Sequence, residues 1–320
     1  MQRITHLAAF DAGAPTWKKI RELLDFNPSR DVPAPRDAAS VVVLRDRSQR
    51  LEVFCVRRHS KSAFLGGALV FPGGKVDAAD GADAWEGLVN TPHTRGPAFA
   101  GTSATASILA IAGARETLEE GAILPVTGEL DAAGVEEILQ EVAQGGSLPS
   151  ILARRALRLA LDALVPWARW VTPIAESRRF DARFFLLELP QGQVGRHDEH
   201  ETTMSFWGTP QEVLDRAAEG EFFVAPPTAR TLELLAGART VSEAMALAER
   251  QSLQPICPLF VGALGDEPPY LALPGDPSHE VRERWVEGPS RYVLRNGQFV
   301  GEEPQITAGR PLDEERKQTS

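Results

Sequence analysis

Residues 115–121 read Arg-Glu-Thr-Leu-Glu-Glu-Gly, and this stretch decides the fold that we expect. It ends a segment, residues 104–121, in which apolar side chains provide a buried surface and Gly121 marks the stop, so we predict a helix there. The carboxylates of Glu116, Glu119 and Glu120 then project from one face, because positions i, i+3 and i+4 are neighbours on a helix. Three like charges repel there unless cations compensate them, and Mg²⁺ or Mn²⁺ suits such hard oxygen ligands.

The alternative for this stretch is an ordinary solvated acidic face, since Glu is a good helix former. A second segment, residues 70–74 (Val-Phe-Pro-Gly-Gly), favours the metal site over this alternative. Glycine lets the backbone approach a ligand closely and can expose a carbonyl oxygen to a metal. A turn of this kind leaving a strand would place such carbonyls beside the helix, so the two segments together favour a metal site.

The two segments resemble a Nudix box, whose usual pattern is G-x5-E-x7-R-E-U-x-E-E-x-G-U. The matching residues are Gly74, Arg115, Glu116, Glu119 and Glu120. The departures are Asp80 in place of the first Glu, Thr117 in place of an apolar residue, and Ala122 in place of the second Gly, with Ile123 following. The spacing from Asp80 to Arg115 is far longer than seven residues, so an insertion at about residues 77–103 splits the box.

A split box of this kind is similar to the coenzyme A diphosphatase-like Nudix proteins, the branch related to the mammalian peroxisomal enzyme. The blocks that carry the resemblance are residues 57–60 (Arg-Arg-His-Ser), 64–80, in which Gly66 stands where the branch has Pro, 170–173 (Trp-Val-Thr-Pro) and 178–185. It covers roughly residues 37–236. The resemblance implies an α/β Nudix fold, an α/β/α sandwich with a mixed sheet, a helical insertion and a C-terminal extension.

The resemblance also implies the roles of individual residues. Glu119 and Glu120 correspond to metal ligands, Glu116 to a ligand or the general base, and the Gly73 carbonyl to a further ligand, with Mg²⁺ or Mn²⁺ as the cofactor. We predict that Arg115 pairs with Glu119 and fixes its rotamer. Nudix enzymes often add an acidic residue before a Trp-bearing strand, for which Glu201 is the first choice and Glu199 the second. An exposed charged loop is the alternative for that segment.

Several residues outside the helix are candidates for substrate contacts. Arg57, Arg58, Arg178 and Arg179 are predicted to meet additional phosphates, because Arg forms bidentate contacts with them. Phe64 is a candidate for lining an acyl or pantetheine channel. Surface solubility for the arginines and an ordinary core position for the phenylalanine stay open as alternatives.

The sequence divides into an N-terminal segment and linker (1–36), a Nudix domain (37–238) and a C-terminal extension (239–320) whose tail is expected to be disordered from about residue 301. The extension is expected either to close over the pocket or to form a homodimer interface. The predicted elements are a hairpin of residues 40–44 and 51–56, a strand at 183–189, helices at 134–144, 149–165, 209–218 and 241–250, and a hairpin at 292–300.

Composition limits the classes of partner. The chain of 320 residues carries 34 Lys and Arg against 44 Asp and Glu, which disfavours nucleic acid and anionic membrane surfaces as partners. The most apolar helical segment, residues 149–170, contains Arg and Asp and is not predicted to span a membrane. Two cysteines make no disulfide framework, and the N-terminus has no secretion signature, so a cytoplasmic protein is expected.

These observations predict the metal-dependent hydrolysis of a small-molecule diphosphate. Coenzyme A or acyl-coenzyme A, giving 4′-phosphopantetheine or its acyl derivative and adenosine 3′,5′-bisphosphate, is the substrate that the branch resemblance favours. An ADP-ribose, nucleotide-sugar or NADH pyrophosphatase is the enzymatic alternative. A Nudix-fold sensor that binds a nucleotide without cleaving it is the alternative from another class.

Overall fold

The computed structural model describes residues 32–59, 66–93, 95–101, 103–196, 202–262 and 268–304. Their centre is a nine-stranded mixed sheet of order β10-β3-β2-β1-β8-β7-β11, in which β4 also pairs with β1 and β9 with β2. The strands are β1 (Arg36–Arg47), β2 (Arg50–Arg58), β3 (Ala68–Val70), β4 (Gly73–Lys75), β7 (Val165–Val171), β8 (Phe180–Glu188), β9 (Thr202–Gly208), β10 (Phe223–Val224) and β11 (Pro255–Ile256).

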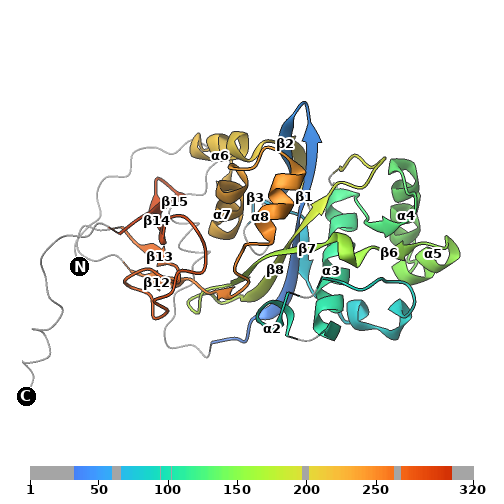
Figure 1. Ribbon diagram of the computed structural model, residues 1–320, viewed down its shortest axis with the longest axis horizontal. Helices are drawn as coiled ribbons and strands as arrows, with labels where there is room; N and C mark the ends of the chain where they lie inside the picture. Colours follow the sequence, from blue (N-terminus) through green and yellow to red (C-terminus); the bar gives the residue numbers. More distant parts are fainter. Residues whose placement is uncertain are drawn as a thin grey trace, which may run out of the picture.

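Helices cover both faces of this sheet (Figure 1). One side holds α3 (Ser103–Gly121), α4 (Ala132–Ala143) and α5 (Leu148–Arg154), and the other holds α6 (Pro210–Ala218), α7 (Pro226–Leu235) and α8 (Val241–Ala248). Strand β1 shows why both faces of the sheet need a covering layer, since its alternate side chains point to opposite faces. Val41 and Val43 pack in the core with α3, whereas Val42 and Leu44 pack in the core with α6 and α7. The expected α/β/α sandwich with a mixed sheet is therefore confirmed.

The segment between β4 and α3 consists of short helical turns anchored to the body of the protein. It contains the 3₁₀ turns Ala78–Gly81 and Asp83–Trp85 and the helix α2 (Pro97–Ala100). Trp85 and Phe99 are buried in the α3-side core. Arg169 and Arg183 of the central sheet donate hydrogen bonds to the carbonyls of Ala98 and Phe99. The insertion is therefore packed against the sheet through both apolar and polar contacts.

One predicted helix is much shorter than expected. The segment 149–165 was predicted to be a single helix, but α5 ends at Arg154 and is followed by β6 (Arg158–Leu159), which pairs with β5 (Val126–Thr127), and a 3₁₀ turn. Ala156 ends the helix by adopting a left-handed conformation with φ of 53°, and the Leu157 amide donates to the Leu152 carbonyl. Alanine is unusual at such a position, so the sequence carried no stop signal there.

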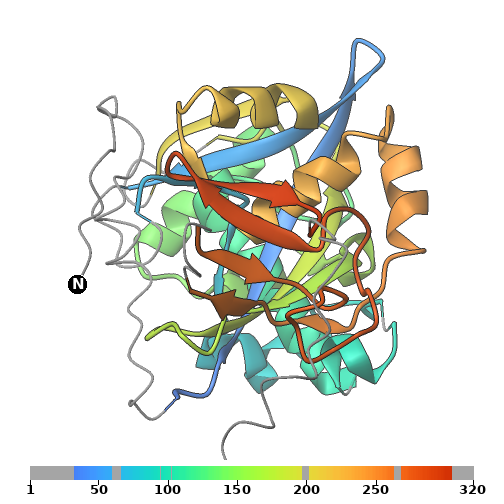
Figure 2. The same cartoon turned by 90° about the vertical axis from the view of Figure 1, so that its left-hand side faces the viewer.

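The C-terminal extension forms a four-stranded antiparallel sheet of β12 (Leu259–Val261), β13 (Tyr270–Ala272), β14 (Arg291–Arg295) and β15 (Gln298–Glu302). In Figure 2 this sheet lies in front of the rest of the molecule. The predicted hairpin is confirmed, because Asn296 and Gly297 both have positive φ and Arg295 pairs with Gln298. Strand β15 continues through Gly301, so the ordered chain reaches beyond the predicted start of the tail.

Within the described part of the chain, no helix is both long and apolar enough to cross a membrane.

Candidate active site

The two segments singled out in the sequence lie against each other where β4 meets the last two turns of α3. The Gly73 amide donates a hydrogen bond of 3.0 Å to Glu120 Oε2. A Cβ atom at Gly74 would lie 2.4 Å from Glu116 Oε1, and one at Gly73 would lie 2.5 Å from the Ala39 carbonyl oxygen. A larger residue at Gly73 would collide with the backbone of β1, and one at Gly74 would push the Glu116 carboxylate out of its position.

Arg115 holds the acidic residues of this region together. Its Nε lies 2.8 Å from Asp80 Oδ1, and its NH1 lies 2.8 Å from Glu116 Oε1 and 3.1 Å from Glu119 Oε2. Burial by itself disfavours the charged guanidinium, but the hydrogen bond to Asp80 and the charges of Glu116 and Glu119 raise the pKa of Arg115 above its usual value. The predicted Arg115–Glu119 pair is present, and Arg115 also pairs with Asp80 and Glu116.

Asp80 joins the insertion to α3. Its side chain is 1% exposed, and both of its oxygens accept from Arg115, at 2.8 and 3.1 Å. Asp80 Oδ2 also accepts from the Asp77 amide at 2.7 Å as part of a capping box on the first 3₁₀ turn. Asp80 therefore contacts the arginine of the box across 35 residues of sequence, and the insertion loops out between them.

Arg58 lies close to the most buried of the three carboxylates. Glu120 is 3% exposed, and Arg58 NH1 is 3.8 Å from its Oε1. A bulge in the pairing of β2 with β9 falls between Arg57 and Arg58, and bulges often redirect side chains next to active sites. Among the described residues, Arg58 Nε is the one buried side-chain nitrogen or oxygen without a hydrogen-bond partner. This N–H is a donor available to a ligand.

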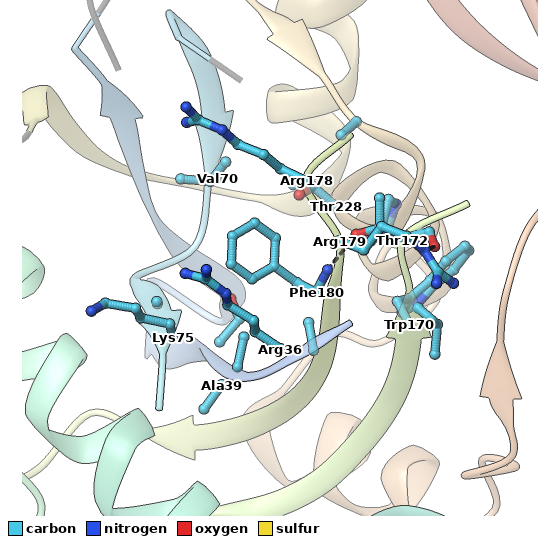
Figure 3. Close-up of a pocket in the computed structure, with 18 of the residues that line it drawn as sticks. Arg36, Ala39, Val70, Lys75, Trp170, Thr172, Arg178, Arg179, Phe180 and Thr228 are labelled. Carbon is cyan, nitrogen blue, oxygen red and sulfur yellow. Dashed lines mark hydrogen bonds between the residues drawn. The ribbon is translucent and has the colours of Figure 1, made fainter. Parts of the chain in front are cut away.

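A pocket of about 1000 Å³ opens in front of these residues. Its acidic side is formed by Glu116, Glu119 and Glu120, with Gly73 and Gly74 beside them. The rest of the lining consists of cationic and apolar side chains, and Figure 3 shows the ring of Phe180 projecting into the pocket. These side chains include Arg36, Arg58, Lys75, Arg178, Arg179, Trp170, Phe180, Phe223, Leu271 and Phe299.

The predicted substrate-binding residues differ in their placement. Arg58 and Arg178 line the pocket, whereas Arg57 is not part of its lining and donates instead to the Gly67 carbonyl at 3.2 Å. Arg179 lines the pocket, but its guanidinium donates to the carbonyls of Thr172 and Pro33. Arg179 thereby holds together backbone segments at the pocket edge.

Three predictions fall on residues outside the described part of the chain. They are the assignments of Phe64 to a channel and of Glu201, or Glu199, to the catalytic site. The Gly73 carbonyl stays a predicted ligand, since the contact observed to the carboxylates is made by the amide of that residue.

Several residues of the pocket lining were not among the predicted site residues. Arg36 stood in the predicted linker, and Glu176, which is 9% exposed and lines the pocket, carried no signal. Phe180 lies inside the quoted block 178–185, so it was available as a candidate. Leu271 and Phe299 come from the extension, in which no residue was predicted to take part in the reaction.

The donor set fits a hard divalent cation by its chemistry. Arg115 pairs with the carboxylates of Asp80, Glu116 and Glu119, and Arg58 lies near that of Glu120, so the four acidic groups exceed these two cationic ones. Carboxylate oxygens are the preferred ligands of Mg²⁺ and Mn²⁺. Among the described residues, no three side chains of His, Cys, Asp or Glu converge as a metal-ligating group. In this arrangement Arg115, by pairing with Glu116 and Glu119, provides the compensating positive charge.

The mixed sheet between helical layers, with a glycine pair packed on a carboxylate-bearing helix, defines the Nudix class of protein. The chain belongs to the Nudix hydrolase superfamily: the family model described as the NUDT19 Nudix domain matches residues 104–235. The acyl-coenzyme A diphosphatase NUDT19 of Xenopus laevis is 28% identical over 244 residues, which are 63% of this chain and 64% of that protein.

Two further comparisons agree with the fold. The putative nudix hydrolase 7 of Caenorhabditis elegans is 25% identical over 261 residues, covering 81% of this chain and 79% of that protein. The crystal structure of a Nudix hydrolase from Alicyclobacillus acidocaldarius superposes with a TM-score of 0.57 at 29% identity, covering 70% of this chain and 99% of that one. The chain spans a little under two thirds of the length of the vertebrate NUDT19 proteins that it matches from Xenopus laevis and Gallus gallus.

Proposed function

We propose that this protein hydrolyses the diphosphate linkage of coenzyme A or acyl-coenzyme A with the help of Mg²⁺ or Mn²⁺. The observation that carries the proposal is the composition of the pocket. One cavity is lined by an excess of carboxylates beside Gly73 and Gly74, by several arginines and by many apolar side chains. The similarity to proteins named acyl-coenzyme A diphosphatases supports the choice of substrate.

In this proposal Glu116, Glu119 and Glu120 hold the divalent cation. When bound, the cation supplies charge neutralisation for the diphosphate and lowers the pKa of water. Glu116 or an acidic residue of the 199–201 segment takes the proton from the attacking water. Glu120 contributes to metal binding more than the other two because it is the most buried and is fixed by the Gly73 amide at 3.0 Å.

The arginines of the pocket bind the phosphates that the cation does not neutralise. Arg58 offers a buried Nε–H close to Glu120, and Arg36 and Arg178 lie elsewhere in the lining. Guanidinium groups make short charge-assisted contacts with phosphate oxygens. A substrate with more than one phosphate, such as coenzyme A, matches a pocket that offers both carboxylates for a cation and arginines for phosphates.

The test is identification of products by mass spectrometry. Purified protein is incubated with coenzyme A, acetyl-coenzyme A, ADP-ribose and NADH in Mg²⁺, in Mn²⁺ and in EDTA, with Glu120→Gln in parallel. We expect 4′-phosphopantetheine or its acyl form together with adenosine 3′,5′-bisphosphate, dependent on metal and lost in the variant.

Two other outcomes would overturn parts of the proposal. Cleavage confined to ADP-ribose or NADH would keep the chemistry and reject coenzyme A as the substrate. Binding of a nucleotide, seen as a raised melting temperature, without any product in either metal would support the sensor alternative instead.

A further inference from the structure

The C-terminal sheet forms part of the wall of the pocket. Leu271 of β13 and Phe299 of β15 line the same cavity as the carboxylates of α3, although they follow them by more than 150 residues of sequence. Pro258, directly before β12, is a third lining residue from the extension. The extension is therefore a component of the site.

The part of the pocket near this sheet is apolar. The rings of Phe223 and Phe299 are 6.0 Å apart and pack with Ala68, Ala225 and the partly buried Val70. The first two residues of α7 are Pro226 and Pro227, which have no amide hydrogen to donate. This helix start therefore presents proline rings to the pocket where other helices would offer N–H groups to an anion.

A buried polar cluster fixes the sheet in place. Arg230 of α7 is 1% exposed and donates from NH2 to the Pro289 carbonyl at 2.7 Å, and from NH1 to the Glu287 carbonyl. Its Nε lies 2.9 Å from the Tyr292 hydroxyl and 2.8 Å from Glu233 Oε2. Because α7 also lines the pocket, the cluster sets the position of the apolar wall relative to the rest of the site.

We propose that Leu271 and Phe299, together with Phe223, form a specificity wall that selects an apolar acyl group attached to the diphosphate-bearing substrate. A nucleobase fits this part of the pocket poorly, because its hydrogen-bonding groups would face side chains that cannot satisfy them. An acyl chain, by contrast, is stabilised further by each methylene that this surface removes from water. This inference rests on the proposed diphosphate hydrolysis and assigns the part of the pocket lined by Phe223, Leu271 and Phe299.

The experiment compares kcat/KM for coenzyme A and for its acetyl, hexanoyl, decanoyl and palmitoyl thioesters. Phe299→Ala enlarges the pocket beside the specificity wall, and Phe299→Trp makes it smaller. Val300→Ala is the matched control, because the neighbouring side chain is 42% exposed and absent from the pocket lining. We expect the preferred chain to become longer in Phe299→Ala and shorter in Phe299→Trp, with the ratio of decanoyl to acetyl activity changing about tenfold in opposite directions.

The opposite signs separate a specificity role from a loss of stability, since unfolding would lower all activities together. If the decanoyl-to-acetyl activity ratio is unchanged in both Phe299 variants and coenzyme A is still cleaved, the specificity role of these residues is rejected. The proposed function is then unaffected.

If the wild-type protein cleaves none of these compounds, the proposed function fails, and the wall is tested by binding. Melting temperatures with decanoyl-coenzyme A and with coenzyme A would then be compared in EDTA. A larger shift from the decanoyl compound that Phe299→Ala reduces would support the wall, and equal shifts would overturn it.

Discussion

Arg115 and Arg230 are both surrounded by oxygen atoms, but the charge around them differs. Arg115 contacts Asp80, Glu116 and Glu119, and the buried Glu120 lies on the same helix face. Arg230 contacts one carboxylate, that of Glu233, with carbonyl oxygens and the Tyr292 hydroxyl making up its other partners. The first cluster is anionic beyond what its arginine compensates, whereas the second is balanced.

In this molecule the balance of charge distinguishes a cluster suited to binding a cation from a structural one. Buried charges stabilise a fold only when they are paired and hydrogen-bonded, as they are around Arg230. A surplus of carboxylates around Arg115 is unfavourable for folding and useful for binding a cation. Substitutions in the two regions should therefore affect different properties.

The largest effect is expected for Glu120→Gln. Activity should fall by about a thousandfold, equivalent to about 4 kcal/mol of transition-state stabilisation. Stability in EDTA should stay the same or rise, because the amide oxygen still accepts from the Gly73 amide while one of the crowded charges is removed. Steady-state kinetics and thermal melting measure the two effects. A strongly destabilised variant would mean that this cluster is structural.

Arg230→Met should do the reverse. Removing the buried arginine leaves the partly exposed Glu233 and two carbonyls without this donor, and the unsatisfied groups should lower stability by about 3 kcal/mol. Denaturant unfolding measures the loss. The double variant Arg230→Met with Glu233→Gln is the control, and it should recover part of the stability. Equal stability of the single variant and the wild type would contradict the comparison.

Asp80→Asn should have an intermediate effect on both properties. Losing the charged partner of Arg115 should lower stability by about 1.5 kcal/mol. Arg115 would then pair more strongly with Glu116 and Glu119, and Mn²⁺ affinity should weaken about tenfold. The electron paramagnetic resonance signal of free Mn²⁺ reports the affinity without requiring activity. Asp83→Asn, an exposed position of the same insertion, is the control and should change neither.

The smallest effect is expected at Asp276 in the extension. Burial by itself raises the pKa of this carboxyl, but Arg291 at 2.8 and 3.0 Å, the Ser278 amide and the Ser290 hydroxyl lower it below the usual value. A lowered pKa in the folded state means that the carboxylate stabilises the protein above the unfolded pKa, about 3.9, and that this stabilisation is lost as the pH falls through the folded value.

The measurement for Asp276 is the unfolding free energy of the wild type and Asp276→Asn at pH 7 and near pH 3. The variant should be about 1 kcal/mol less stable at pH 7, with a smaller difference at pH 3. A difference that stays constant over this range would show that charge is not the cause.

Local patterns carried much of the fold and the centre of the site. The spacing of Glu116, Glu119 and Glu120 sets their common face as soon as a helix forms, and Asn296-Gly297 specifies its hairpin through positive φ. Separate sequence blocks also agreed on the Nudix sandwich. The end of α5 at Arg154 was missed because Ala156 adopts a left-handed conformation, which is uncommon for alanine.

The acidic helix, the glycine pair and the class of fold were therefore predictable, because each is signalled by short motifs that can be recognised one at a time. Only the tertiary structure decided that Leu271 and Phe299 face the same pocket as Glu120 and that Arg179 binds backbone carbonyls. An apolar residue in a short strand has the same sequence signature whether it fills a core or lines a cavity. What separates the two cases is the packing of distant elements, here set by the contacts of Arg230.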